Sequence, residues 1–417
     1  MVTLVLLTFL VTVGVSRLTS RQWPLAWIGP LAGLLLLCLF GLEAQLRGRD
    51  LFISDENIYL AEGRTADLAS LKDRYLWILL NALVLRYDWS LGGLPLKLVG
   101  LPLLALLVAL LWRLFGRDRL VWAVPVMLPY MAYTAAFNLR DTAILTATAG
   151  SVYLLDGGAR RWRGAFVLAL GALYLLRPVI ALLSAAIWLG ILAASGLAGV
   201  ARGRVPVRAL LVVGGSLVVA GALFSRPVLD RVQRYVVWYE YLAGEGFTER
   251  ALERGLDPAF ASGPWENRIA VGAARYVVAP MPTSLLSRIL RGGTPQWGLV
   301  DDVVRLIHQL AYYAMVAFLV LRWRSWIPAL RALSRGQVMM LAALVLYLPL
   351  YSAYHFGAGH QRIKIPFQLA VMLFAIAVHR ARERHAQPQR PDGVANERAR
   401  VRRPGPQGVL VPRASGL

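Results

Sequence analysis

The chain has 417 residues, of which 58% are hydrophobic and only 16% are charged, and its formal net charge is +22. A soluble chain of this length carries about a quarter charged residues, so the composition excludes an ordinary soluble globular protein. Several apolar runs approach or exceed about 18 residues, the length that crosses a bilayer as a helix, and they do not alternate as the strands of a membrane barrel do. The predicted fold class is all-α, a polytopic membrane protein.

About eleven transmembrane helices are expected. The run at 3–16 has no positive segment before it and no clear cleavage site, so we interpret it as a retained helix and not as a signal peptide. The runs at 165–176 and 178–196 are joined at Arg177-Pro178 and form either a tight hairpin or one kinked helix. The expected spans are 3–16, 24–42, 95–113, 121–137, 142–157, 165–176, 178–196, 208–225, 303–321, 338–355 and 365–379.

Arginine clusters predict the orientation. Every second connection is rich in arginine, namely those after residues 16, 113, 157, 196, 321 and 379. Short basic loops stay in the cytoplasm, so we expect a multi-pass protein of the cell inner (cytoplasmic) membrane with the N-terminus outside and the C-terminus in the cytoplasm. The same clusters favour anionic lipid headgroups over nucleic acid as the partner of this positive charge.

The remaining connections are then external, and two of them are long, at 43–94 and 226–302. Residues 73–87 have apolar positions at helical spacing with charges at the ends, which predicts an amphipathic helix along the interface. The segment 226–302 combines Trp, Tyr and Arg, which suits an interface belt or stacking on sugar rings. Residues 1–384 are thus expected to form one membrane domain. Residues 385–417 are rich in Pro, Gly and Arg and are expected to be a disordered basic cytoplasmic tail; within it, LVPR at 410–413 resembles the start of a thrombin cleavage site.

An acidic island at 51–62 is the first candidate site. Asp55 and Glu56 adjoin each other, with Tyr59 one helical turn further on. A carboxylate at the membrane surface can accept a proton from an attacking hydroxyl, ligate a metal or position a substrate hydroxyl, and it can also be an ordinary solvated loop charge. The single cysteine, Cys38, lies in an apolar run and excludes a disulfide and a Cys-based metal site. No cofactor and no metal are indicated.

Cationic residues on the same predicted face are the second group of candidates. Arg140 and Asp141 lie between two spans, where Arg140 can hold a phosphate and Asp141 can orient it or cap the next helix; a plain turn is the alternative. Arg177 stands in an apolar stretch and needs a partner or a polar cavity.

The third group follows the tenth span. His360, Arg362 and Lys364 lie at the outer edge of the last span, where positive charge runs against the usual bias and suits a bound phosphate. Snorkelling to lipid headgroups is the alternative.

The Asp55-Glu56-x-x-Tyr59 pattern resembles the acidic motif in the first external loop of the GT-C superfamily of integral-membrane glycosyltransferases. The likeness is strongest to the bacterial protein-mannosyltransferase and aminoarabinose-transferase branch (GT39/GT83-like), and it covers roughly 50–145 and 357–380, including HQRIKIPFQ near the end. The resemblance implies Asp55 as the catalytic base or as the acid that positions the acceptor, Glu56 as its neighbour and a polyprenyl-phosphate sugar as donor. The additional span 3–16 and the late external segment 226–302 depart from that family.

Three functions follow as hypotheses. The first is a glycosyltransferase that moves a sugar from polyprenyl phosphate to a glycan, lipid or protein acceptor on the outer face, in cell-envelope synthesis. The second is an O-antigen or exopolysaccharide polymerase or ligase that uses an undecaprenyl-diphosphate glycan. The third is a transporter or flippase of a lipid-linked sugar, although no internal repeat of the kind common in transporters is evident.

Overall fold

The computed structural model describes residues 2–65, 74–88, 94–156, 163–201, 237, 265–293, 298–354 and 361–386. Within these ranges the chain is helical and contains no strand, as the composition predicts. The helices of the first half are α1 (Val2–Thr19), η1 (Ser20–Trp27), α2 (Ile28–Leu46), α3 (Ser54–Thr65), α4 (Tyr75–Asp88), α5 (Leu94–Leu98), α6 (Gly100–Leu114), α7 (Leu120–Met127), α8 (Pro129–Ala135), α9 (Asp141–Leu155), α10 (Arg163–Leu176) and α11 (Pro178–Ala201). Those of the second half are α16 (Trp265–Val278), α17 (Pro282–Leu290), α18 (Gly298–Leu321), η4 (Trp323–Ser325), α19 (Trp326–Ala332), α20 (Arg335–Val345), α21 (Tyr347–Tyr354), η5 (Gln361–Lys364) and α22 (Ile365–Ala386).

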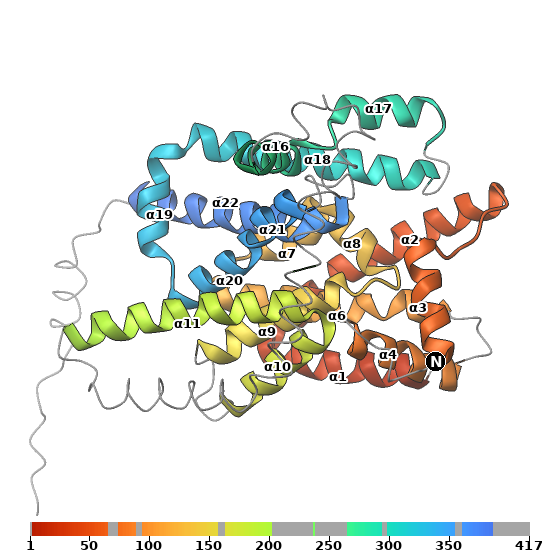
Figure 1. Ribbon diagram of the computed structural model, residues 1–417, viewed down its shortest axis with the longest axis horizontal. Coiled ribbons are helices and arrows are strands. Elements are labelled where there is room, and N and C mark those ends of the chain that lie inside the picture. Colours follow the sequence, from red (N-terminus) through yellow and green to blue (C-terminus); the bar gives the residue numbers. More distant parts are fainter. Residues whose placement is uncertain are drawn as a thin grey trace, which may run out of the picture.

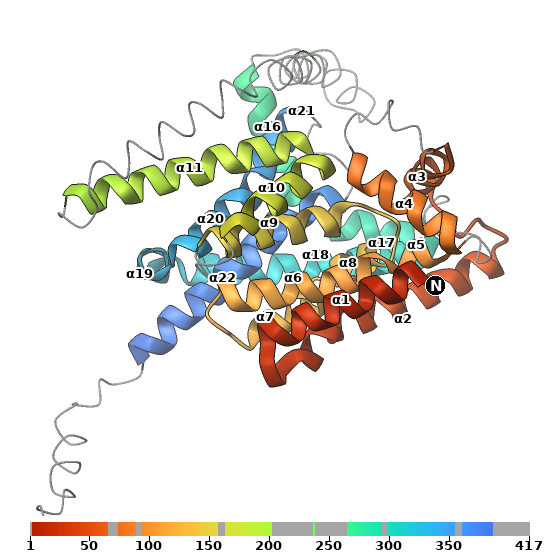
Figure 2. The same ribbon diagram turned by 90° about the horizontal axis from the view of Figure 1, so that it is seen from below.

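Helix α6 forms the centre of the bundle, and α1, α2, α7, α8 and α9 all contact it (Figures 1 and 2). Its sequence is apolar around the whole circumference, which is typical of a helix surrounded by protein, and most of its residues are buried. Close packing here requires glycine: a Cβ on Gly100 would lie 2.2 Å from the carbonyl oxygen of Ala135 in α8.

The outer helices carry apolar stripes that face away from the protein. On α2 the exposed side chains include Leu31, Leu35, Leu39, Leu42 and Leu46, a spacing that places these five on one side of the helix. An exposed apolar surface of this size is typical of contact with a membrane.

Five helical segments of the described part are long and apolar enough to cross a membrane: Gln22–Leu46, Leu94–Leu114, Pro178–Ser195, Gly298–Leu321 and Gln361–Arg384. The expected spans 3–16 and 165–176 form shorter apolar helices. Those at 121–137 and 338–355 are each divided, at Leu128 and Leu346. The span 208–225 lies outside the described residues. The count of eleven is therefore not confirmed, whereas the all-helical class with several candidate membrane-spanning helices is.

The break at Arg177-Pro178 separates two helices, α10 and α11, which contact each other. Proline lacks an N–H and is favoured at the first helical position, and Pro178 begins α11. The helix expected at 73–87 is present as α4, with Trp77 and Ile78 buried and Tyr87 exposed; that it lies along the membrane interface stays a prediction.

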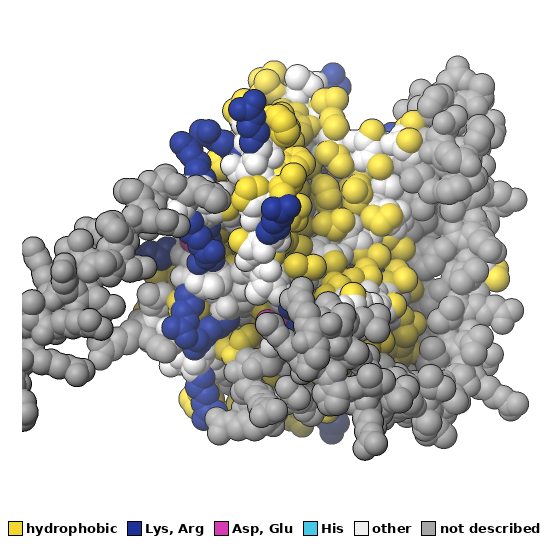
Figure 3. Space-filling view, turned by 90° about the vertical axis from the view of Figure 1, so that its left-hand side faces the viewer, with side chains coloured by type: hydrophobic (Ala, Val, Ile, Leu, Met, Phe, Trp, Pro, Cys, Tyr) yellow, Lys and Arg dark blue, Asp and Glu magenta, His cyan; other side chains and the backbone are white. Residues whose placement is uncertain are grey.

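The arginine-rich connections that the structure describes meet at one end of the bundle, here called the basic end. Arg380 of α22 donates to the carbonyl oxygen of Phe115 after α6 (2.7 Å) and pairs with Asp118 (3.2 Å). Arg335 before α20 pairs with Asp156 after α9 (3.2 Å). Figure 3 looks onto this end and shows Lys and Arg side chains gathered on it. The side of the membrane that this end faces stays a prediction.

Candidate functional site

Asp55 lies in the first turn of α3, where the helix dipole favours a negative charge. Its carboxylate forms an ion pair with the guanidinium of Arg362 in η5, 307 positions later in the chain. Both side chains are partly exposed, 34% for Asp55 and 22% for Arg362. The structure thus brings an acidic and a cationic candidate residue into direct contact at an accessible position.

Glu56 points the opposite way, into the protein. Its side chain is fully buried and accepts hydrogen bonds from Lys97 Nζ at 2.9 and 2.7 Å, from the backbone N–H of Ile53 at 2.9 Å and from that of Asn138 at 2.7 Å. Successive helical residues differ by about 100° in direction, so Asp55 and Glu56 cannot share one face. The expectation that Glu56 joins Asp55 in catalysis does not fit this placement, and Glu56 is better described as a structural anchor.

Lys97 is the buried partner that sequence reasoning missed. Its ammonium lies 4.3 Å from the ring centroid of Phe137, 4.9 Å from that of Phe52 and 5.7 Å from that of Phe40. Three aromatic faces and a carboxylate together stabilise a cation that would otherwise be costly to bury. The sequence could have identified Lys97 as a buried, paired residue, because it is a lysine within an apolar span.

The turn between α8 and α9 forms hydrogen bonds with residues of α3, α4 and α10. Asn138 contacts Glu56 through its backbone N–H and donates through its side chain to Asn81 Oδ1 (2.5 Å). Arg140 donates to the carbonyl oxygen of Leu176 at the end of α10 (3.1 Å). Asp141 begins α9, and its charge, like that of Asp55, acts on Arg362. Asp141 therefore lies in the same electrostatic neighbourhood as the Asp55–Arg362 pair.

Arg177 lies at the break between α10 and α11. Its guanidinium lies over the ring of Tyr351 in α21, 5.4 Å from the centroid, and Tyr351 stacks on Tyr347 (5.8 Å). The charges of Arg177, Asp141 and Arg140 all act on the Tyr347 hydroxyl. Three of the predicted residues thus lie within electrostatic range of one aromatic pair.

Lys364 is bound to backbone groups of the protein. Its side chain is fully buried and donates to the backbone carbonyl oxygens of Arg275 (3.0 Å) and Ala279, at the C-terminal end of α16. Cations stabilise helix C-termini, so Lys364 anchors α16, and the expected phosphate contact of Lys364 does not fit. Beside it, burial raises the pKa of the Tyr276 hydroxyl well above its ordinary value, and this protonated hydroxyl donates to the carbonyl oxygen of Ile363 (2.7 Å).

Tyr59 and His360 are the two remaining predicted residues. Tyr59 is buried on α3 with the guanidinium of Arg74 over its ring (5.3 Å), and Tyr59 is also within electrostatic reach of Arg362. His360 lies outside the described residues, as does most of the segment 226–264.

A buried polar layer joins α18, η5 and α22. Its ion pair joins Arg305 to Asp301 (2.7 Å). A chain of side-chain hydrogen bonds then links His308 to Gln368 (2.8 Å) and Gln361 to Gln368 (2.9 Å). These residues lie on α18, η5 and α22, and they would have been suggested by the polar positions 301–309 at helical spacing in the ninth span.

The arrangement offers a partly exposed carboxylate with a guanidinium in contact with it. Two further guanidinium groups, those of Arg140 and Arg177, lie on the connections before α9 and α11. Such a site can accept a proton and neutralise a phosphate on adjacent groups. Within the described residues no group of three or more His, Cys, Asp or Glu side chains could hold a metal ion.

Comparison with protein-family models, with curated proteins and with solved structures finds no match for this chain.

Proposed function

We propose that this chain is a membrane-embedded glycosyltransferase that moves a sugar from a polyprenyl-phosphate donor to an acceptor at the outer face of the cytoplasmic membrane. The observation that carries the proposal is the contact between Asp55 and Arg362 at an accessible position. The resemblance of the Asp55-Glu56-x-x-Tyr59 pattern to GT-C glycosyltransferases supports it independently.

In the proposed reaction Asp55 takes the proton of the acceptor hydroxyl. The acceptor oxygen forms a bond to the anomeric carbon while the bond from that carbon to the phosphate oxygen breaks, and polyprenyl phosphate leaves with the electron pair. Arg362, Arg140 and Arg177 supply the positive charge that stabilises the leaving group.

Before the donor binds, Asp55 and Arg362 are paired with each other. A donor phosphate competes with the Asp55 carboxylate for Arg362, because a guanidinium binds either anion through charge-assisted hydrogen bonds. Donor binding thereby releases the Asp55 carboxylate for the acceptor.

The test is Asp55→Asn in the full-length protein, reconstituted in proteoliposomes and supplied with a panel of polyprenyl-phosphate monosaccharides and membrane extract as acceptor. Transfer is expected to fall by roughly 10²- to 10⁴-fold, the usual contribution of a general base. The matched control is Glu62→Gln on the same helix, whose carboxylate pairs with Arg74 and not with Arg362.

Unchanged transfer in Asp55→Asn would falsify the assignment of the base. Activity only with an undecaprenyl-diphosphate oligosaccharide would instead assign a polymerase or ligase. Movement of the lipid-linked sugar across the bilayer without transfer would assign a flippase.

A further inference from the structure

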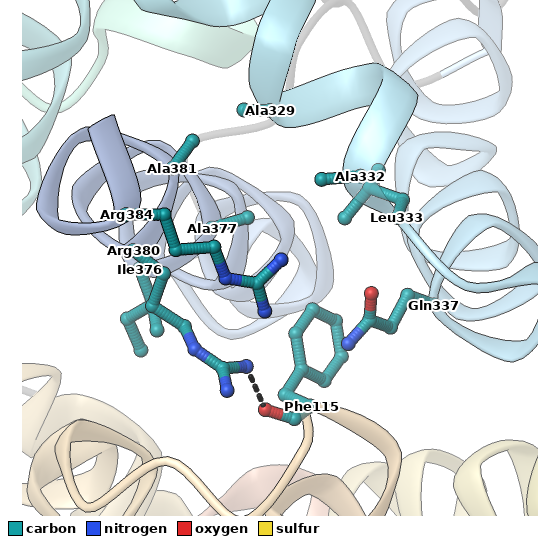
Figure 4. Close-up of a pocket in the computed structure, with 10 residues that line it drawn as sticks. All are labelled: Phe115, Ala329, Ala332, Leu333, Gln337, Ile376, Ala377, Arg380, Ala381 and Arg384. Carbon is teal, nitrogen blue, oxygen red and sulfur yellow. Dashed lines mark hydrogen bonds between the residues drawn. The ribbon is translucent and has the colours of Figure 1, made fainter. Parts of the chain in front are cut away.

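A hollow opens at the basic end between α19, the start of α20, α22 and the residue that follows α6, as Figure 4 shows. It is open to solvent and holds a cavity volume of about 50 Å³. Ala329, Leu333, Ile376 and Ala381 make much of its wall apolar, and the guanidinium groups of two arginines line it as well.

The two arginines differ in what they bind. Arg380 and Arg384 are four residues apart on α22, so they share one face of the helix. Arg380 is held by the carbonyl oxygens of Phe115 (2.7 Å) and Gly116 (3.3 Å) and by Asp118 (3.2 Å). Arg384 has no hydrogen bond or ion pair with any residue that the structure describes, and its guanidinium is directed into the hollow (Figure 4). The hollow therefore presents a cation to whatever enters it.

The surface beside the hollow is apolar and aromatic. Leu321, Trp323, Ile327 and Leu330 are between 53% and 79% exposed on the end of α18, on η4 and on α19. Trp and aliphatic side chains next to arginines are typical of the boundary between lipid headgroups and acyl chains. The same face carries the concentration of Lys and Arg side chains in Figure 3.

We propose that this hollow binds the phosphodiester headgroup of an anionic glycerophospholipid, with Arg384 as the main phosphate contact, Arg380 as the second, and the acyl chains along Ile327 and Leu330. Basic pockets between membrane helices bind such headgroups, and a guanidinium donates two parallel hydrogen bonds to phosphate oxygens. Because an apolar surface adjoins the Arg384 guanidinium, a membrane lipid, whose acyl chains can cover that surface, is favoured over a soluble phosphate.

This lipid site is separate from the proposed catalytic site. Arg362 precedes α22 and Arg384 lies near its end, so the two guanidinium groups are separated by about the length of that helix, roughly 30 Å at 1.5 Å per residue. The proposal therefore does not depend on the proposed glycosyltransferase function.

Lipid retention by the full-length protein tests the proposal. The purified protein is incubated with equal amounts of phosphatidylglycerol and phosphatidylcholine, and bound lipid is counted by native mass spectrometry. The wild type is expected to retain phosphatidylglycerol in preference. Arg384→Gln is expected to weaken that binding about fivefold, the loss of about one arginine–headgroup interaction.

Two further variants make the test specific. Arg382→Gln removes the same charge from the same helix but does not line the hollow, and it is expected to bind phosphatidylglycerol as the wild type does. Ala332→Leu keeps both arginines and fills the hollow from α19, and it is expected to lose binding as Arg384→Gln does.

Three results would overturn the proposal: equal loss of phosphatidylglycerol in Arg384→Gln and Arg382→Gln, full retention in Ala332→Leu, or no preference of the wild type over phosphatidylcholine. Displacement of phosphatidylglycerol by excess inorganic phosphate would overturn the assignment of a lipid as the occupant.

Discussion

Lys97 donates to both carboxylate oxygens of Glu56, and neither side chain reaches solvent. Glu56 also accepts the backbone N–H of Asn138, so one buried carboxylate joins the start of α3, helix α5 and the turn before α9. Asp55 adjoins Glu56, and Arg140 follows Asn138 by two residues. The buried Glu56–Lys97 pair therefore sets the position of the Asp55 carboxylate relative to Arg140.

Removing one partner of this pair is expected to destabilise the protein strongly. Lys97→Met leaves a buried carboxylate without its counter-ion, which costs about 3–5 kcal/mol. The double variant Glu56→Gln/Lys97→Met removes both charges and is expected to recover part of that loss. Recovery is incomplete because a glutamine amide has one acceptor oxygen for the two backbone N–H groups that Glu56 binds. Thermal unfolding in detergent measures this, and a double variant as unstable as the sum of the two single variants would contradict the buried pair.

The N-terminus of α18 depends on Glu43 of α2. The Glu43 carboxylate accepts the backbone N–H of Leu299 (2.6 Å) and that of Val300 (2.8 Å). Gly298 permits this approach, because it has a φ of +85° and a Cβ there would lie 2.7 Å from the carboxylate oxygens. Glu43→Gln is expected to cost about 1 kcal/mol, since it removes the negative charge from a helix N-terminus.

The control for Glu43 is Glu383→Gln, which neutralises a carboxylate that is 63% exposed near the end of α22. Its effect is expected to stay within about 0.5 kcal/mol. Comparable melting temperatures for the two variants would show that Glu43 does not cap α18.

Helix α16 packs against α21 through a glycine. A Cβ on Gly272 would lie 2.2 Å from the carbonyl oxygen of Ser352, so Gly272→Ala must push the two helices apart. The expected destabilisation is about 1–3 kcal/mol, as for other overpacked sites. Gly171→Ala on α10 has nothing within 4 Å of the new Cβ and is expected to be neutral or to stabilise by up to about 1 kcal/mol through helix propensity. A melting temperature of Gly272→Ala at or above that of Gly171→Ala would rule out the close contact.

Arg362 is expected to matter for the donor more than for folding, because its guanidinium is partly exposed beside Asp55. Arg362→Gln is expected to lower kcat/KM for the polyprenyl-phosphate sugar by roughly 10- to 150-fold, the loss of a hydrogen bond to a charged group of about 1.5–3 kcal/mol. Arg47→Gln serves as control, since Arg47 pairs with Glu43 and contacts the loop after α17. Equal kcat/KM for the two variants would remove Arg362 from the proposed site.

The all-helical class and most helix positions could be predicted from the sequence, because a long apolar run has few stable alternatives to a helix in lipid. The break at Pro178 and the helix at 73–87 are local features, and the structure contains both. The count of spans was less predictable. Leu128 and Leu346 interrupt apolar runs that composition alone reads as continuous.

The candidate residues themselves were found from chemistry that is visible in sequence: carboxylates in an apolar chain and arginines outside the basic loops. What each of them contacts was decided by the tertiary structure. Asp55 and Glu56 are neighbours in sequence, yet the helix turns one toward Arg362 and the other toward Lys97. Lys364 was grouped with Arg362 by sequence, and it instead holds the carbonyl oxygens at the end of α16. Sequence determines which charges a membrane chain carries, whereas burial and partner are properties of helix rotation and long-range packing, which no local pattern encodes.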